Sequence, residues 1–320
     1  MRDLKAVSLK GRPTMVPSIA LCGVHLLFEG RFIVSAHIFD EYWLERRLLP
    51  PPTTLIDALR RLADRPDLFV FEQRIPDDQP LYDHFYEWNN YAVLKLTTYD
   101  EWFQKQIPSS TRRAVRASGN RGLVVTPTRY DDDYVRGIVS IYNETPIRAG
   151  RRFWHFGKTF DAVKRENGTY TERSTYLAAH CRGEIVGYLK MVMDGDTAAI
   201  MQVLSKTSCG AYRPNNALIA EAVRICCDRH VRYLLYENFE YGKKREDSLT
   251  RFKSGNGFIR MNVPRYYVPL TSIGAVALRM GLHKALSTHV PEPIAARLRR
   301  VRAALCERLV RGMRDGNATV

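Results

Sequence analysis

A short polar stretch between residues 141 and 160 gathers side chains that bind anions and move protons. It contains seven of them: Glu144, Arg148, Arg151, Arg152, Trp154, His155 and Lys158. Arginine can grip a carboxylate or phosphate through two parallel hydrogen bonds, while tryptophan and histidine rings can stack on a sugar or base. Glutamate and histidine are common proton acceptors in catalysis. The stretch is therefore predicted to bind a substrate, although Glu144 could instead pair with Arg148 four residues later on a helix.

A second candidate site lies where a strand over 198–206 gives way to a helix over 217–230. The N-terminus of a helix exposes backbone N–H groups and carries a partial positive charge, so it attracts anions. Four polar residues lie just before this helix: Lys206, Arg213, Asn215 and Asn216. They predict an anion-binding site, and the alternative is a helix that is capped and nothing more.

Composition indicates a folded protein with an anionic partner. The chain has 320 residues, of which 45% are hydrophobic and 26% charged, and its formal net charge is +15. Such an excess favours nucleic acid, a phosphorylated cofactor or an anionic lipid surface, without choosing among them. The six cysteines form no C-x-x-C pair, so neither a zinc site nor a disulfide framework is predicted. The most apolar early run is too short to span a membrane, and we expect a cytoplasmic protein.

The elements that must position these residues alternate between strands and helices in the first half of the chain. We expect two strands joined at Glu29-Gly30 within 19–38, a helix over 53–62, strands over 68–73 and 91–96, and helices over 99–107, 111–119 and 131–145. The helix over 111–119 is basic. It contains Arg112, Arg113 and Arg116, and Arg121 follows just beyond its end. Its arginines form either a solvated face or a surface that contacts phosphate or tRNA.

The second half has a cleaner pattern. From residue 175 it reads as an antiparallel meander of three strands, the helix over 217–230, a strand over 231–239, a short helix over 248–256 and a final strand pair over 257–270. This order predicts an α+β fold in which helices cover the faces of a mixed sheet. The residues from 283 onward predict an amphipathic basic helix.

Three phrases within this order resemble a known group of enzymes. They are TRRAVRASGNRGLVV at 111–125, IYNETPIRAG at 141–150 and SLTRFKSGNGF at 248–258. With the order of elements, they resemble the GNAT superfamily of N-acyltransferases, and more specifically its FemAB-like group, which is related to the peptidoglycan-bridge aminoacyltransferases and carries two GNAT-like units in tandem. The resemblance implies a reduced first unit over 1–125, a complete acyltransferase unit over 126–282 and a helical tail over 283–320.

The resemblance also implies a reaction. Enzymes of this kind transfer an acyl group, acetyl or aminoacyl, from acyl-CoA or aminoacyl-tRNA to an amino group. The donor would lie in a gap between the strands over 198–206 and 233–239, with its phosphate groups at the helix that follows Arg213. The loop SKTSCGAYRPNN departs from the Gln/Arg-x-x-Gly-x-Gly/Ala spacing of CoA-binding loops. The choice between acetyl-CoA or another acyl-CoA and aminoacyl-tRNA therefore stays open.

Roles for individual residues follow from the same resemblance. Lys253 would stabilise the developing oxyanion, or else simply favour the C-terminal end of its helix. Glu144 or His155 would take the proton of the attacking amine, and the rest of the stretch 141–160 would face the acceptor. Glu237 and Tyr241 would line the cleft, or else form a satisfied pair at the strand end.

The implied acceptor is a small-molecule or lipid-linked amine, for example a cell-envelope precursor. Arginines around the apolar stripe of the tail would bring the protein to the inner face of a membrane as a peripheral protein. Two other classes stay open: a non-catalytic tRNA-binding protein that keeps the fold, and a structural protein of the membrane surface. The sequence indicates no stable protein partner and no metal.

Overall fold

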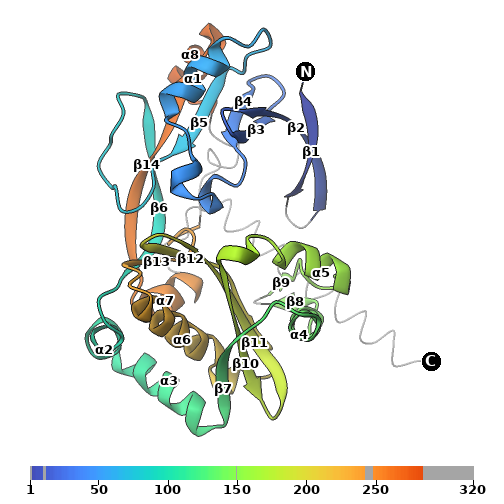
Figure 1. The fold of residues 1–320 in the computed structure, drawn as a ribbon, viewed down its shortest axis with the longest axis vertical. Coiled ribbons are helices and arrows are strands. Elements are labelled where there is room, and N and C mark those ends of the chain that lie inside the picture. Colours follow the sequence, from blue (N-terminus) through green and yellow to red (C-terminus); the bar gives the residue numbers. More distant parts are fainter. Residues whose placement is uncertain (1, 10–11, 149, 242–247, 284–320) are drawn as a thin grey trace, which may run out of the picture.

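The computed structural model describes residues 2–9, 12–148, 150–241 and 248–283, which form a twelve-stranded mixed sheet covered by helices (Figure 1). The order of strands across this sheet is β1-β2-β3-β4-β5-β14-β6-β13-β12-β11-β10-β7. Their bounds are β1 Asp3–Leu9, β2 Arg12–Leu21, β3 Val24–Glu29, β4 Ser35–Ile38, β5 Leu68–Glu72, β6 Tyr86–Lys95, β7 Leu123–Thr128, β10 Ser174–Cys181, β11 Glu184–Asp194, β12 Thr197–Ser205, β13 Tyr233–Leu235 and β14 Ile259–Pro269. A separate hairpin pairs β8 (Ile147–Arg148) with β9 (Arg151–Arg152).

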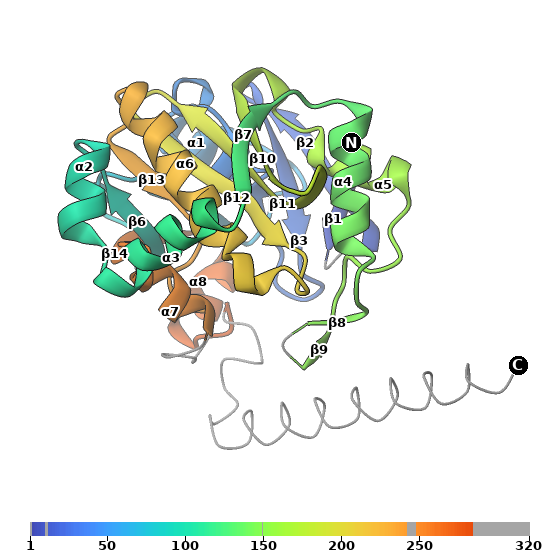
Figure 2. The same cartoon turned by 90° about the horizontal axis from the view of Figure 1, so that it is seen from below.

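Helices cover both faces of the second half of the sheet. The α-helices are α1 Pro52–Arg60, α2 Tyr99–Glu101, α3 Ser109–Asn120, α4 Asp132–Tyr142, α5 Phe160–Asn167, α6 Pro214–Asp228, α7 Ser248–Gly255 and α8 Ser272–Arg279. Figure 2 shows α3 and α6 on one side of β10–β12, and α4 and α5 on the other.

Period-2 alternation along the strands explains why both faces are covered. On β10, Leu177 and Ala179 pack in the core that contains α6, whereas Tyr176 and Ala178 pack in the core that contains α4 and α5. Successive side chains of a strand point to opposite faces, so a strand that is apolar at every position must be buried on both. The three-strand meander predicted from residue 175 is therefore the middle layer of a three-layer structure.

The strand nearest the C-terminus joins the first half of the sheet. β14 lies between β5 and β6 and is antiparallel to both, with Arg265 opposite Glu72 and Ile259 opposite Val93. The sequence predicted a strand pair over 257–270, but the chain runs through this region as one strand. Pro264 does not interrupt it, and its carbonyl accepts a hydrogen bond from the N–H of Gln73 at 3.0 Å.

Two further local predictions were wrong. The predicted strand at 19–28 is divided by a tight turn at Cys22-Gly23, both with left-handed backbone (φ 51° and 84°), so β2 and β3 are separate strands. Gly23 is suited to this conformation, but Cys22 carries no turn signal in its side chain. The helix α8 was not predicted. The predicted tail helix from residue 283 onward lies outside the described residues.

Candidate functional site

Strands β12 and β13 part soon after they pair. They are parallel neighbours over three residues each, from Thr197 opposite Tyr233 to Ala199 opposite Leu235. β13 ends there, whereas β12 continues to Ser205. The chain after β13 stays with β6, because Tyr236 N donates to Ala92 O at 2.9 Å and Ala92 N donates to Glu237 O at 2.8 Å. The two strands therefore separate as predicted, but after Ala199 and not, as the sequence suggested, after residue 204. We call this separation the strand split.

A β-bulge lies on β12 at the strand split. Lys190 of β11 faces Gln202 but Met191 faces Ile200, so Met201 is an extra residue in the ladder. A bulge leaves its extra residue outside the regular hydrogen bonds and changes the direction of nearby side chains. Met201 thus lies outside the regular ladder to β11, two residues beyond the last pair of β12 with β13.

A basic cleft lies between α3 and the first turn of α6. Among the described residues, its lining includes three arginines and no acidic residue. The lining residues are Ser110, Thr111, Arg113, Ala114, Ala117, Arg121, Arg213 and Asn216. Arg213 has left-handed backbone (φ 56°) directly before Pro214, the first residue of α6, and no side chain caps this helix end. The partial positive charge of the helix end thus adds to three guanidinium groups. We call this site the arginine cleft.

The four residues predicted at this helix end have different surroundings. Arg213 and Asn216 line the arginine cleft, and Asn216 Nδ2 also donates to Asn256 Oδ1 at 3.2 Å. Lys206 is paired with Glu184 at 3.2 Å. The side-chain oxygen of Asn215 is buried without a hydrogen-bond partner in the described part of the chain. These contacts make Arg213 and Asn216 the stronger candidates for donor binding.

Two arginines of α3 complete the arginine cleft. The sequence left Arg113 and Arg121 undecided between a solvated face and a phosphate contact, and the fold brings both to the start of α6. Arg121 Nη1 also donates to Ala211 O, in the 3-10 turn η5 (Gly210–Tyr212) just before α6. Their spacing on α3 signals only a basic helix, because nothing local to that helix indicates what lies opposite it.

A larger cleft, of about 680 Å³, lies on the other face of the sheet between the N-terminal strands and the segment that follows α4. Gln202 of the strand split lines it and contacts α4 through Tyr142 Oη at 3.3 Å, whereas Ile200 and Val203 pack on the α6 side. The lining also contains four aromatic residues and four carboxylates, namely Phe39, Trp43, Trp154, Tyr170, Glu29, Asp40, Glu166 and Glu237. No lysine or arginine is among its lining residues in the described part of the chain. We call it the large cleft.

His155 forms part of the wall of the large cleft and is 4% exposed. Its ring centroid lies 4.1 Å from that of Tyr142 and 3.5 Å from that of Trp154. The ring nitrogen Nε2 is 3.0 Å from Gln202 Nε2, and Nδ1 is 3.5 Å from Lys158 Nζ. Burial, together with the charges of Lys158 and Arg148, lowers the pKa of His155 to about 3. The imidazole is therefore neutral near pH 7 and a weak proton acceptor.

Glu144 holds a loop in place. Its two carboxylate oxygens accept hydrogen bonds from the backbone N–H groups and hydroxyls of Thr207 and Ser208, at 2.6–2.9 Å. Burial favours the protonated carboxyl, but these hydrogen bonds outweigh it and lower the pKa of Glu144 to about 2. The expected pairing with Arg148 is present at 3.3 Å. These contacts favour a structural role for Glu144 and do not support its use as a proton acceptor.

The three arginines of the stretch 141–160 do not line the large cleft. Arg148 is half-buried and donates to Ser205 O at 2.8 Å and Ile141 O at 2.7 Å. Arg151 and Arg152 form the exposed strand β9. Lys158 pairs with Glu166 at 2.5 Å, and its ammonium group lies 4.3 Å from the ring centroid of Trp154. Of the predicted acceptor-binding residues of this stretch, Trp154 is thus the one that lines the cleft, beside His155.

Lys253 is fully buried beneath the segment that follows β13. Its Nζ donates to the carbonyl of Asn238 at 2.6 Å and lies 4.4 Å and 4.9 Å from the ring centroids of Tyr236 and Tyr241. Tyr241 Oη in turn donates to Glu237 Oε2 at 2.5 Å. Lys253 thus supports the side of the strand split that carries Glu237. Its predicted contact with the donor stays a prediction.

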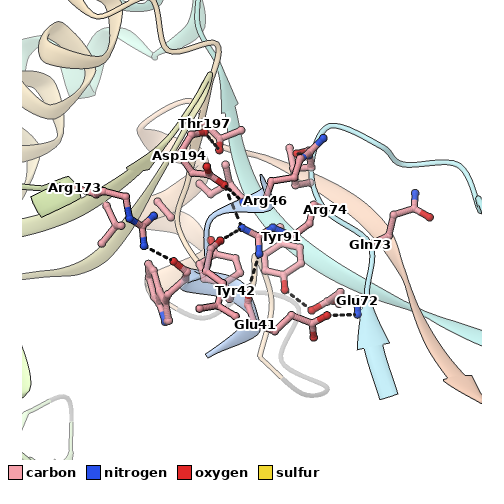
Figure 3. A pocket seen from close by; sticks show the side chains of 16 residues that line it. Glu41, Tyr42, Arg46, Glu72, Gln73, Arg74, Tyr91, Arg173, Asp194 and Thr197 are labelled. Atoms are coloured by element: carbon pink, nitrogen blue, oxygen red, sulfur yellow. Dashed lines mark hydrogen bonds and ion pairs between the residues drawn. The ribbon is translucent and has the colours of Figure 1, made fainter. Parts of the chain in front are cut away.

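A polar cavity lies at the junction of the two halves, and Thr197, Ala199 and Leu235 beside the strand split are among the residues that line it (Figure 3). Burial raises the pKa of Glu41 to about 8, and it also raises the pKa of Glu72. Glu72 N donates to Glu41 Oε1 at 2.9 Å, and Tyr91 Oη donates to Glu72 Oε2 at 2.6 Å. Arg74 lies 3.5 Å from Asp194, which ends β11. These groups bind mainly to one another and hold the segment after β4 against the second half of the sheet.

Two searches of the described residues found nothing. No helix among them is long and apolar enough to cross a membrane. No group of three or more His, Cys, Asp or Glu side chains among them is arranged to hold a metal ion.

Comparison with known proteins gives a likeness in structure. No protein-family model matches the sequence, and no curated protein matches it. Among solved structures, FemX aligns with a TM-score of 0.52 at 10% identity, over 87% of this chain and 90% of that one. The C-terminal domain of a protein from Agrobacterium fabrum, described as a lysylphosphatidylglycerol synthetase, gives 0.52 at 11% identity, over 82% and 87%. L-PGS from Bacillus licheniformis gives 0.50 at 12%, over 82% and 87%. At these identities the likeness is one of fold: the chain shares the α+β fold of FemX and of these two other structures.

Proposed function

We propose that this protein is an N-acyltransferase that moves an acyl group from a phosphate-bearing donor to an amino group. The observation that carries the proposal is the strand split between β12 and β13, with the arginine cleft at the start of the next helix and the large cleft on the opposite face. Phosphate groups suit the arginine cleft, because guanidinium groups and a helix N-terminus both favour anions. The acceptor would enter through the large cleft and meet the acyl group at the split.

The chemistry of this reaction assigns tasks to residues at the split. The acceptor nitrogen forms a bond to the acyl carbon, the bond from that carbon to the sulfur or oxygen of the donor breaks, and the leaving atom gains the proton that nitrogen loses. Backbone groups at the Met201 bulge lie where the oxyanion would develop, and such groups are effective because they need no reorganisation. Glu237 lines the large cleft directly after β13 and is a better placed proton acceptor than His155, whose pKa is about 3.

The donor is either an acyl-CoA or an aminoacyl-tRNA. Both carry phosphate groups that would contact Arg213. A tRNA would also use Arg113 and Arg121 together with neighbouring basic groups, so its binding would weaken steeply as salt is raised. An acyl-CoA would depend less on salt.

A thermal-shift experiment on the full chain tests the proposal. Acetyl-CoA, longer acyl-CoAs and aminoacyl-tRNA would each be added, and product formation with an amine acceptor would be followed in parallel. A donor at one hundred times its Kd stabilises the native state by about 2.7 kcal/mol. We expect one donor to raise Tm, and a double variant, Arg121→Ala with Arg213→Ala, to lose most of that shift.

Two exposed arginines provide the control. Arg60→Ala with Arg136→Ala removes the same charge at exposed sites outside both clefts, where the arginines pair with neighbouring aspartates and Arg136 also lies over the Phe160 ring, so donor binding should persist. Equal loss in both double variants would indicate general charge attraction and count against a donor site in the arginine cleft. A tRNA that binds tightly without any acyl turnover would instead favour a non-catalytic nucleic-acid-binding protein.

A further inference from the structure

The arginine cleft and the large cleft carry opposite charge. Among the residues that the structure describes, the arginine cleft is lined by three arginines and no acid, and the large cleft by four carboxylates and no lysine or arginine. This separation occurs in a chain whose formal net charge is +15. An acidic cleft in a basic protein concentrates cations at one place and repels the phosphate groups that the rest of the surface attracts.

We infer that the acceptor in the large cleft is a cationic amine with at least two ammonium groups, such as a diamine or a linear polyamine. The inference rests on the proposed acyl transfer, for which it names the class of acceptor. It differs from the expectation that the arginines of the stretch 141–160 bind the acceptor, because those arginines are not among the residues that line the large cleft.

Three of the four carboxylates have no ion pair in the described part of the chain. Glu166 is neutralised by Lys158 at 2.5 Å. Asp40 accepts a hydrogen bond from Tyr170 Oη, and Glu237 accepts one from Tyr241 Oη, each at 2.5 Å. A tyrosine hydroxyl leaves the negative charge in place and fixes the direction of the carboxylate. Asp40 and Glu237, with Glu29 nearer the rim, can therefore bind more than one ammonium group.

Aromatic rings in the same cleft favour the same kind of ligand. Trp154, whose ring centroid lies 4.3 Å from the Lys158 ammonium group, is 54% exposed although it lines a cleft, and Trp43 and Tyr170 line the same cleft. The face of an indole or phenol ring attracts ammonium and methylene groups together. A polyamine alternates these two groups along its length. The volume, about 680 Å³, leaves room for an extended chain beyond the reacting nitrogen.

The need for a second positive charge follows from the reaction. An amine attacks an acyl carbon only when it is neutral, whereas a nearby carboxylate stabilises its charged form. An acceptor with one amino group would be held by the carboxylates in its unreactive state. A diamine can place one ammonium group against Asp40 and present its other nitrogen, after losing a proton, to the donor at Glu237. The donor itself is a poor occupant of this cleft, because its phosphate groups would face the carboxylates.

Calorimetry on the full chain with spermidine, a linear triamine, tests this inference without a donor. Butylamine provides a single charge, and lysinamide represents the cationic aminoacyl part of a donor. The test variant is Asp40→Asn with Glu237→Gln. Both replacements keep the shape and can still accept the tyrosine hydrogen bonds, and Asn is well tolerated at the left-handed backbone of residue 40 (φ 53°). The matched control, Asp57→Asn with Glu101→Gln, makes the same change in net charge at exposed helix positions.

We expect spermidine to bind at least about tenfold more tightly than butylamine, and the test variant to weaken spermidine about tenfold while the control changes it less than about twofold. Equal weakening in both variants, equal affinity for butylamine and spermidine, or selective binding of lysinamide would each overturn the inference. Turnover separates this result from the proposed function. Efficient acylation of neutral or singly charged amines would keep the acyltransferase and reject the polycationic acceptor, whereas spermidine binding with no turnover by any donor would reject the acyltransferase.

Discussion

Replacing Glu144 by glutamine should destabilise the fold in a way that depends on pH. The carboxylate accepts four hydrogen bonds from Thr207 and Ser208, and its pKa is about 2 instead of the model-compound value of 4.5. A pKa that is lower by about 2.5 in the folded protein corresponds to a free-energy difference of about 3 kcal/mol in favour of the charged form of Glu144. The side chain is 16% exposed, so solvent reduces this value, and we expect Glu144→Gln to lower the free energy of unfolding by about 2 kcal/mol at pH 7.

The pH dependence follows from the direction of the shift. A carboxyl whose folded pKa is depressed contributes its full stability above its unfolded pKa and loses it as pH falls toward its folded pKa. The wild type should therefore lose the Glu144 contribution between about pH 4.5 and about pH 2, whereas the glutamine variant has none to lose. Urea unfolding at pH 7, 4.5 and 3.5 measures this, and the difference between the two proteins should shrink by about 1 kcal/mol at pH 3.5.

Glu184→Gln is the matched control. It removes the partner of Lys206, which neighbours the same loop, but Glu184 is 73% exposed, and such surface pairs contribute at most about 1 kcal/mol. If Glu144→Gln costs no more than this control, or if its effect is the same at pH 3.5 as at pH 7, then Glu144 does not hold the loop as described. Glu144→Gln should also weaken donor binding, because the loop that Glu144 anchors leads into the start of α6.

Three further predictions concern buried groups. His155→Gln should make the free energy of unfolding less dependent on pH. Burial lowers the folded pKa of His155 to about 3, so the wild type should lose about 1.5 kcal/mol of the free energy of unfolding between pH 6.5 and 5. Urea unfolding of the variant should not show this loss. Lys253→Met keeps the buried stem but leaves the Asn238 carbonyl without its donor, so a loss of about 1–3 kcal/mol in the free energy of unfolding is expected, and a neutral result would contradict the contact described. Gly274→Ala should lower Tm strongly because a Cβ would collide with the carbonyl of Asp67, whereas Gly119→Ala in α3 meets nothing and should stabilise by about 0.5–1 kcal/mol; equal effects would refute the difference in packing.

Local patterns were sufficient for most elements and for the strand split. The alternation in 175–205 and the helical spacing in 217–230 each report on one segment, and both segments fold as expected. Arg213 was found because its place before a helix predicts its surroundings. Gln202, Asp40 and Trp43 were missed, because they reach the large cleft through strand pairing and through contacts between residues more than one hundred positions apart, such as Tyr170 with Asp40. No spacing in the sequence records such a contact.

The predicted role of the arginines in the stretch 141–160 shows a related limit of sequence analysis. Arginines in a polar loop have a strong affinity for anions, but affinity says nothing about whether the groups they meet belong to a ligand or to the chain. Arg148 is bound by the carbonyls of Ile141 and Ser205 and by Glu144. The large cleft is distinguished by the lack of lysine and arginine among its described lining residues. The sequence could not predict this, because it does not show which residues line a cleft.

The position of β14 affects how the protein can be made and divided. It pairs with β5 across nearly two hundred residues of sequence, as in Arg265 with Glu72. During synthesis, β5 and β6 therefore lack the strand that pairs with both of them until residues 259–269 have been made. Their unpaired edges stay exposed until then, and folding is slow. We expect a fragment ending at residue 125 to aggregate, and coexpression with the remainder of the chain to rescue its solubility.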